Sequence, residues 1–216
     1  AIWLWPPSQT GPTILLAQAG ERLEGALPDG SSISLNAGSE VRYVPHQWDQ
    51  HRRLELKGEA YFEVEKGSSF EVATELGIVT VLGTRFNVRA RDGKLKVTCY
   101  EGRVRVKEGQ YEVEIKAGEE YNQAAAQAID QVKKPSWTQD IINLTEATMS
   151  EVIAEMERQF DVTIEASDLD LEVVGTYNFS VTSLTDAVDQ VFGSEKIRLV
   201  KVGEKQVRLQ KVSSEE

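Results

Sequence analysis

The sequence predicts a mainly β protein, in which a larger all-β domain is followed by a smaller α+β domain. Sixteen glycines are spread along the 216 residues. They separate short runs rich in Val, Ile, Phe and Tyr, which is typical of strands joined by tight turns. Apolar and polar residues alternate within these runs, and helical spacing appears only toward the C-terminus. The strand spacing alone leaves a sandwich, a barrel and a solenoid-like stack open for the larger domain.

The charge of the chain excludes some classes of partner. The formal net charge is −11, and proteins that bind nucleic acid need a basic surface to replace counterions. Anionic lipid is disfavoured for the same reason. Residues 135–216 hold 16 acidic and 7 basic side chains, whereas residues 1–134 hold 19 and 17. The acidity therefore belongs to the second domain, either as a solvated surface or as a face for a basic partner.

The most regular strand pattern runs from Leu54 to Val88. The order Tyr, Phe, Glu, Val over residues 61–64 and the order Phe, Glu, Val, Ala over residues 70–73 predict strands with one apolar face. Gly83 is expected at a sharp bend or at a close approach between strands, because glycine tolerates positive φ. Turns are predicted at the glycines that interrupt this stretch: Gly58, Gly67, Gly77 and Gly83.

Four regions follow one another along the chain. Residues 1–12 contain two tryptophans and three prolines and are interpreted as a membrane-proximal tail, with a local apolar segment as the alternative. The apolar part is too short to cross a bilayer, which takes about 20 residues. Residues 13–123 form the β domain, with a turn at Leu27–Ser31 and hairpin turns at Asp92-Gly93 and Glu108-Gly109. Residues 124–136 are small and polar, and they predict a linker.

Residues 137–212 read as two β-α-β units, with two helices on one face of a single small sheet. Thr148 and Glu151 have the spacing of a capping box, and an apolar stripe from Met149 to Phe160 predicts a helix. A second helix is predicted from Ser183 to Gly193. The predicted strands are residues 141–144, 162–164 and 174–180, followed by a hairpin of residues 197–200 and 206–209.

No enzyme motif is present. Nucleophile triads, phosphate-binding loops and metal-ligand spacings are all missing from the sequence. The one cysteine, Cys99, is expected to be buried, and His46 and His51 without a third ligand make a poor metal site. A hydrolase would have to use carboxylates, but these alternate with apolar residues and are expected on the solvated face of strands. The carboxylates considered for this role are Glu59, Glu63, Glu65 and Glu71. We predict a protein without catalytic activity, metal or cofactor.

Binding is the remaining class of function. A carbohydrate-binding module would use exposed aromatic rings, for which the candidates are Tyr43, Trp48, Tyr61 and Trp137. Aromatic residues at such positions are more often part of the core. A small sheet also has edge strands that can pair with another protein. Val174–Ser180 is the predicted edge, because its glycine weakens it as a central strand, and Val207–Lys211 is the competing choice. The predicted contact residues are Val174, Thr176, Tyr177 and Phe179.

Four segments also resemble a known family in the order and spacing of their residues. They are LPDGSSISLNAGSEV (residues 27–41), LKGEAYFEV (56–64), FEVATELGIVTVLGTRFNV (70–88) and YEGRVRV (100–106). Together they resemble the FecR family, the extracytoplasmic part of membrane-bound sigma-factor regulators. The residues after Ser136 are similar to the short N-terminal domain of secretins and TonB-dependent receptors, which often follows this domain in the Bacteroidetes. The positions that match the family motif are Gly30, Ser31, Gly58, Phe62, Gly83, Thr84, Phe86 and Gly102.

This resemblance implies a fold, a location and partners. It implies a twisted, solenoid-like stacking of strands in the first domain. It places the chain in the periplasm as part of a single-pass inner-membrane anti-sigma factor, whose transmembrane helix and cytoplasmic sigma-binding segment would precede residue 1. The implied partner of the second domain is the periplasmic signalling domain of a TonB-dependent outer-membrane transporter. The signal would then pass to a sigma factor of the extracytoplasmic-function class.

Overall fold

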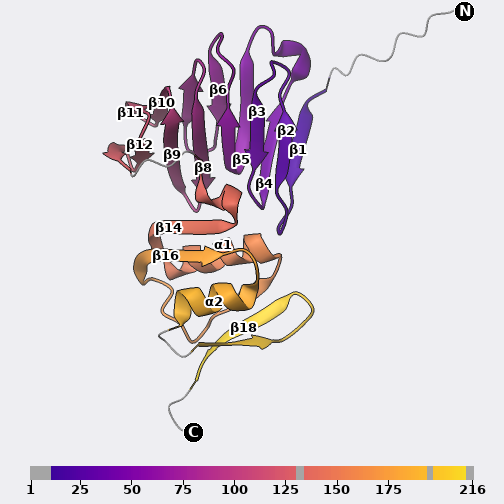
Figure 1. Cartoon of the computed structure of the whole chain (residues 1–216), viewed down its shortest axis with the longest axis vertical. Coiled ribbons are helices and arrows are strands. Elements are labelled where there is room, and N and C mark those ends of the chain that lie inside the picture. Colours follow the sequence, from indigo (N-terminus) through magenta and orange to yellow (C-terminus); the bar gives the residue numbers. More distant parts are fainter. Residues whose placement is uncertain (1–10, 130–133, 194–196, 213–216) are drawn as a thin grey trace, which may run out of the picture. The chain divides into compact units, whose positions relative to one another are not determined.

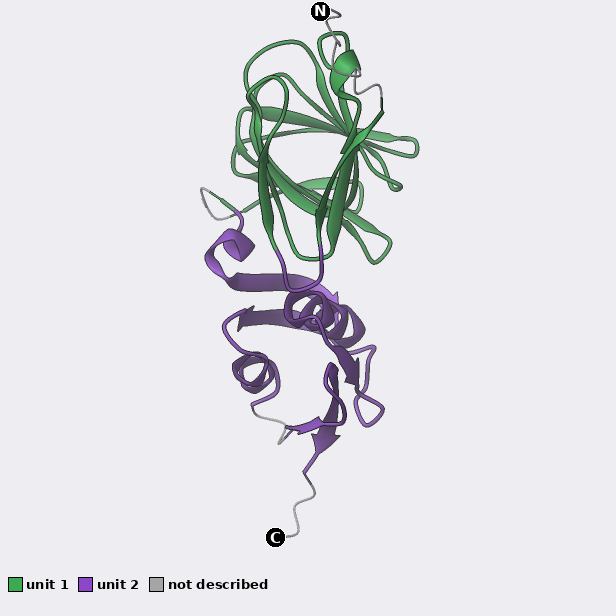
Figure 2. Cartoon of the chain, turned by 90° about the vertical axis from the view of Figure 1, so that its right-hand side faces the viewer, with its two compact units in different colours: residues 1–17, 22–134 green, residues 18–21, 135–216 purple. Residues whose placement is uncertain are grey.

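The computed structural model of the chain describes residues 11–129, 134–193 and 197–212. It divides into two compact units (Figure 1, Figure 2). Unit 1 comprises residues 1–17 and 22–134, and unit 2 comprises residues 18–21 and 135–216. The tail predicted at residues 1–12 lies outside the described residues, apart from its last two positions. The predicted class, mainly β with an α+β part, is confirmed.

Unit 1 consists of 13 strands in one continuous hydrogen-bonded network. The longest strand, β5 (Arg52–Glu63), is shared by two layers. Across the first layer the order is β1 (Thr13–Ala17), β4 (Ser39–Tyr43), β5, β6 (Phe70–Ala73), β7 (Ile78–Val81), β10 (Arg103–Glu108) and β11 (Tyr111–Lys116). Across the second it is β2 (Leu23–Ala26), β3 (Ser32–Leu35), β5, β8 (Arg85–Arg91), β9 (Lys94–Glu101), β12 (Glu119–Asn122) and β13 (Ala125–Ala128).

The two layers enclose one hydrophobic core (Figure 2). Leu54 and Leu56 reach it from the first half of β5, and Ala60 and Phe62 reach it from the second half, all at most 2% exposed. The Phe62 ring stacks on Phe86 with 5.1 Å between ring centroids. Each buried side chain of this size contributes about 1.5–3 kcal/mol relative to an exposed one. Of the arrangements that the strand spacing left open, the structure therefore lies between a sandwich and a barrel, because two layers face each other across one core and β5 joins them into one sheet.

Gly58 marks the point at which β5 passes from one layer to the other. Residues before it pair with β4 and β6, and residues from it onward pair with β3 and β8. Its φ is +98°, and a Cβ atom there would lie 2.6 Å from the Oγ of Ser39. The sequence predicted a turn at this glycine, which is wrong: the strand bends here and continues, because only glycine combines this φ with so close a neighbour.

The other predicted turns connect strands as expected. Asp92 and Gly93, with φ of 54° and 71°, join β8 to β9, which is the left-handed backbone of a tight hairpin. Gly109, with φ of 58°, lies between β10 and β11. Within the segment interpreted as a linker, residues 125–128 form β13, and the helical turn η2 (Ser136–Gln139) follows Pro135.

Unit 2 contains two small sheets instead of the single sheet that the sequence predicted. One pairs β14 (Ile141–Thr148) with β16 (Val174–Ser180). The other has the order β15 (Thr163–Glu165), β18 (Gln206–Lys211) and β17 (Ile197–Lys201). Helix α1 (Met149–Phe160) packs beside β14 and β16 and also contacts β15, while helix α2 (Leu184–Phe192) lies between β16 and the β17–β18 hairpin (Figure 1). Each helix can thus bury more than one side, whereas a single sheet would leave one side exposed.

The start of α1 is fixed by the capping box that the sequence predicted. Glu151 donates its backbone N–H to the Thr148 hydroxyl at 3.2 Å, and Thr148 donates its backbone N–H to the Glu151 carboxylate at 2.8 Å. The two remaining donors of the first turn, from Met149 and Ser150, bind the carbonyls of Val173 and Leu171. All donors of the first helical turn are therefore satisfied by the protein itself.

Candidate interaction surface

The carboxylates considered for catalysis do not converge. Glu59 is only 7% exposed, and its two oxygens accept hydrogen bonds from the side-chain amides of Asn36 and Asn87 at 3.0 and 2.8 Å. The prediction that Glu59 lies on a solvated face is therefore wrong: the carboxylate is buried because two amides satisfy it. Glu65 is exposed after the end of β5.

Glu63 and Glu71 form ion pairs in different layers of unit 1. Glu63 lies 2.9 Å from the Lys134 ammonium and 3.5 Å from Arg85, and the hydrogen bond from Lys134 lowers the pKa of the Glu63 carboxyl. Glu71 pairs with Arg53. Their charges are thus balanced by neighbouring cations. Among the described residues there is also no cluster of three or more His, Cys, Asp or Glu side chains suited to a metal ion.

The aromatic side chains considered for sugar stacking are buried. Tyr43, Trp48, Tyr61 and Trp137 are between 2% and 8% exposed. The Trp48 ring packs edge-on against Tyr43 and Phe70, with centroids 5.3 and 5.8 Å apart. A ring enclosed in this way offers no open face to a sugar, so these residues act as core.

The turn at Gly30 and Ser31 is tied to β5 by a buried cation. Arg52, 7% exposed, lies 2.8 Å from the Asp29 carboxylate and also donates to the backbone carbonyls of Glu65 and Ser68. The Ser31 hydroxyl accepts the backbone N–H of Glu65 at 3.0 Å. Partial burial alone would raise the pKa of Asp29, but the hydrogen bonds from Arg52 and Ser31 hold it below its ordinary value.

The other glycines of the family motif lie where the chain changes layer. Gly83 connects β7 to β8, and a Cβ there would lie 2.8 Å from the Cα of Lys66. Gly102 connects β9 to β10, and its Cβ would lie 2.9 Å from the Thr84 hydroxyl, which itself donates to the Arg103 carbonyl. The predicted close approach at Gly83 is confirmed. These positions hold the two layers together and expose no reactive group.

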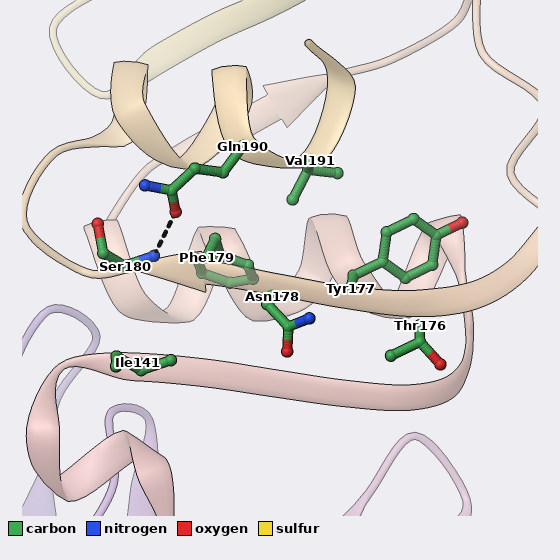
Figure 3. A pocket seen from close by; sticks show the side chains of 8 residues that line it. All are labelled: Ile141, Thr176, Tyr177, Asn178, Phe179, Ser180, Gln190 and Val191. Carbon is green, nitrogen blue, oxygen red and sulfur yellow. Dashed lines mark hydrogen bonds between the residues drawn. The ribbon is translucent and has the colours of Figure 1, made fainter. Parts of the chain in front are cut away.

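The edge of β16 that faces away from β14 is the candidate interaction surface, and α2 lies beside it (Figure 3). Within the described part of the chain, β16 pairs with β14 alone. The N–H of Val181 donates to the carbonyl of Asp140 at 2.9 Å, which makes these two residues a hydrogen-bonded pair. Such pairs occur at every second residue of an antiparallel strand, so the backbone groups of Tyr177 and Phe179 face β14. The N–H and C=O groups of Thr176, Asn178 and Ser180 point away from β14. The outward N–H of Ser180 is accepted by the Gln190 side chain at 2.7 Å.

An open groove of about 660 Å³ runs along this edge (Figure 3). Figure 3 shows Tyr177 on the side of α2 and Thr176 and Asn178 on the opposite side of the strand. Side chains from both faces therefore border the row of outward backbone groups. The residues that line the groove are Ile141, Thr176, Tyr177, Asn178, Phe179, Ser180, Gln190 and Val191.

The four predicted contact residues differ in what they expose. Val174 is 61% exposed and Thr176 is exposed, on the face away from the helices. Tyr177 is half-buried, and Phe179 is only 1% exposed, so Phe179 can reach a partner only through its backbone. The competing edge, Val207–Lys211, is wrong: β18 is the central strand of its sheet, paired on both sides. Sequence reasoning missed Gln190, which no strand pattern would indicate.

Comparison with known proteins identifies the family of unit 1. Residues 14–105 match the FecR protein family. These residues of unit 1 belong to the FecR family. Two crystal structures of a protein from Parabacteroides distasonis ATCC 8503, assigned as an anti-sigma factor, are similar to the chain. One is 27% identical with a TM-score of 0.82, and the other is 28% identical with a TM-score of 0.83.

The likeness of the chain to these structures extends beyond unit 1. It covers 93% and 94% of the chain and all of each solved chain, so unit 2 is part of the shared architecture. No curated protein matches the sequence. Among the residues described, no helix is both long and apolar enough to cross a membrane.

Proposed function

We propose that this chain is the periplasmic sensor part of a transmembrane anti-sigma factor. It receives a signal from the periplasmic signalling domain of a TonB-dependent outer-membrane transporter and relays it to an extracytoplasmic-function sigma factor. The match of residues 14–105 to the FecR family and the likeness to an anti-sigma factor along nearly the whole chain support this proposal. The inner-membrane helix and the sigma-binding segment would lie N-terminal to residue 1.

The open edge of β16 is the observation that carries the proposed contact with the transporter. An extended segment that adds to a sheet edge gains backbone hydrogen bonds, and side-chain pockets beside the edge select among partners. Thr176 and Asn178 offer outward backbone groups, and the groove beside them receives side chains of the added strand. Unit 2, which we propose to be a domain of the short N-terminal type, would thus bind a segment of the signalling domain as an additional strand.

The proposal is tested by changing one outward donor of β16. In Asn178→Pro the outward N–H is lost, and an edge strand tolerates proline on its solvent side. We expect binding to the signalling domain of a TonB-dependent transporter to weaken about tenfold, the equivalent of one hydrogen bond with some steric exclusion. Isothermal titration calorimetry measures the change.

Asn178→Ala is the matched control, because it shortens the same side chain and keeps the N–H. It should bind within about twofold of the parent, since an exposed amide side chain contributes little. Equal weakening by both variants would show that the side chain, and not the strand edge, makes the contact. Full binding by Asn178→Pro would exclude this edge.

A further inference from the structure

Unit 2 separates its charges along the chain. Residues 135–193 contain 12 acidic side chains and one basic side chain, Arg158. Residues 197–212, which form the β17–β18 hairpin, contain five basic side chains and one acidic side chain, Glu204. Unit 2 is therefore acidic as a whole, but its C-terminal hairpin is basic. A local excess of one sign attracts partners of the other sign and speeds their encounter.

Most of this basic charge has no counter-ion in the described residues. Lys205 pairs with Asp161, and Arg208 pairs with Glu165. Arg198, Lys201 and Lys211 are exposed and form no ion pair within residues 11–129, 134–193 and 197–212. Lys201 and Lys211 lie on one face of the hairpin and Arg198 lies on the other, because successive side chains alternate and paired residues share a face. An acidic partner would supply a counter-ion that these cations lack.

The same hairpin has a strand edge available for pairing. In the described part of unit 2, β17 pairs with β18 alone. The Val202 N–H donates to the Gln206 carbonyl at 2.9 Å. Starting from this hydrogen-bonded pair, every second residue of β17 bonds to β18. Ile197, Leu199 and Lys201 therefore direct their N–H and C=O groups away from β18. These three residues form a second open edge, distinct from that of β16.

A groove of mixed character lies between this edge and α2. Its volume is about 370 Å³. Its apolar lining comes from Val188 on α2, from Ile197 and Leu199 on β17, and from Val212, which is 42% exposed. Thr185 and Asp189 add polar groups from α2. Arg198 stands at its border. An apolar side chain of an added strand would fill this groove, and the next residue on that strand would lie beside Arg198, because successive side chains point to opposite faces.

We propose that the β17 edge binds an extended acidic segment of a second protein, in which acidic and apolar residues alternate. The backbone of that segment pairs with Ile197, Leu199 and Lys201. Its apolar side chains enter the groove beside α2, and its carboxylates lie on the face of β17 that carries Arg198. This site does not depend on the β16 edge, so unit 2 has two separate strand edges for binding, one on each side of α2.

The test uses the full chain and a short end-capped peptide of alternating glutamate and valine. We expect the backbone amide signals of Ile197, Leu199 and Lys201 to shift in ¹H–¹⁵N correlation spectra on titration, and binding to weaken as salt is added. The peptide with lysine in place of glutamate should bind at least about tenfold more weakly, because its charge is repelled by the hairpin.

Two pairs of variants assign the binding to this edge. Arg198→Glu should weaken the acidic peptide about tenfold or more by reversing a charge at the edge. Lys201→Pro removes an outward N–H as well as a charge and should weaken binding more than Lys201→Ala, which removes the charge alone. Asn178→Pro, which blocks the other edge, should leave the peptide affinity unchanged.

Several results would overturn the proposal. Shifts confined to Thr176 and Asn178 would place the peptide on β16. Equal affinity for the acidic and basic peptides would remove the argument from charge. Concentration-dependent self-association that Arg198→Glu abolishes would show that a second copy of this chain, and not another protein, occupies the edge.

Discussion

Gly58 shows how a single residue directs the path of unit 1. At φ of +98° it bends β5 from one layer to the other, and its missing side chain leaves room for Ser39. The Ser39 hydroxyl accepts the backbone N–H of Glu59 at 3.0 Å, so the space is used for a hydrogen bond across the bend. The glycine therefore acts on backbone geometry and on packing at once.

Gly58→Ala should destabilise unit 1 by about 1–3 kcal/mol, because the new Cβ requires both a strained φ and a displaced Ser39. Urea unfolding followed by tryptophan fluorescence measures the change. Gly11→Ala is the control: nothing lies within 4 Å of its added Cβ, and its φ is not positive. That variant should stay within about 0.5 kcal/mol of the parent. An unchanged unfolding midpoint for Gly58→Ala would show that neither the positive φ nor the contact with Ser39 requires glycine.

The pair of Asp29 and Arg52 predicts a pH dependence. The folded protein lowers the pKa of Asp29, so the ionised carboxylate stabilises the fold fully above its unfolded value of about 3.9, and this contribution is lost as the pH falls through the lowered pKa. Asp29→Asn leaves Arg52 buried without its counter-ion and should cost about 3 kcal/mol at pH 7.

Unfolding free energies measured from pH 7 to pH 2 check this prediction. The difference between the parent and Asp29→Asn should be constant above pH of about 4 and should shrink below it. Glu65→Gln is a suitable control, because its side chain is exposed. A difference that stays constant through the acid range would show that the charge of Asp29 does not stabilise the fold.

At the scale of the element, α1 is the helix with the best-defined start. Thr148→Ala removes one half of the capping box and should destabilise unit 2 by about 1 kcal/mol, while Thr148→Ser, which keeps the hydroxyl, should cost only a few tenths. Thermal unfolding followed by circular dichroism at 222 nm measures both. Equal losses for the two variants would indicate that the methyl group, and not the cap, supports the helix.

Local patterns were sufficient to predict many elements. The alternation around Phe62, the hairpin at Asp92-Gly93 and the stripe that starts at Met149 all predict structure from neighbours within a few residues. The continuation of β5 through Gly58 could not be predicted in this way, because glycine interrupts the alternation and the reason for it, Ser39, lies 19 positions earlier. The pairing of strands into two sheets in unit 2 is likewise decided by contacts between distant segments.

The candidate surface could be predicted only in part. Val174–Ser180 has the composition of a weak strand, and the structure has one edge of it open. Both strands of the C-terminal hairpin alternate alike, so sequence could not tell that β18 is central and β17 is the edge. The exclusion of β18 depends on its parallel pairing with β15, about 40 residues earlier in the chain. The segregation of basic residues after residue 196 was the available signal for the second edge.

At the scale of the whole molecule, Cys99 reports on the integrity of unit 1. Its side chain is fully buried in the core, and burial raises the pKa of the thiol to about 11. A thiol reacts as the thiolate, so native Cys99 should be almost inert to Ellman's reagent at pH 8. The reaction should become fast in urea at the concentration where unit 1 unfolds. Rapid labelling of the native protein would show that the core opens more readily than its packing implies.

The two-layer arrangement of unit 1 depends on contacts between residues that are far apart in the sequence. Each β7-to-β8 and β9-to-β10 connection returns the chain to the opposite layer, at Gly83 and Gly102. Those crossings require residues far apart in sequence to approach within contact distance. A stack would need only neighbouring strands to meet, which is why the local pattern alone was compatible with both.

Because the 12 residues of β5 belong to both layers, neither sheet can slide past the other without breaking this strand. A pull on one layer is therefore carried by the covalent backbone into the second, and the hydrogen bonds on both sides of β5 resist it together. Unit 1 should respond to mechanical load as a stiff body that yields in a single rupture.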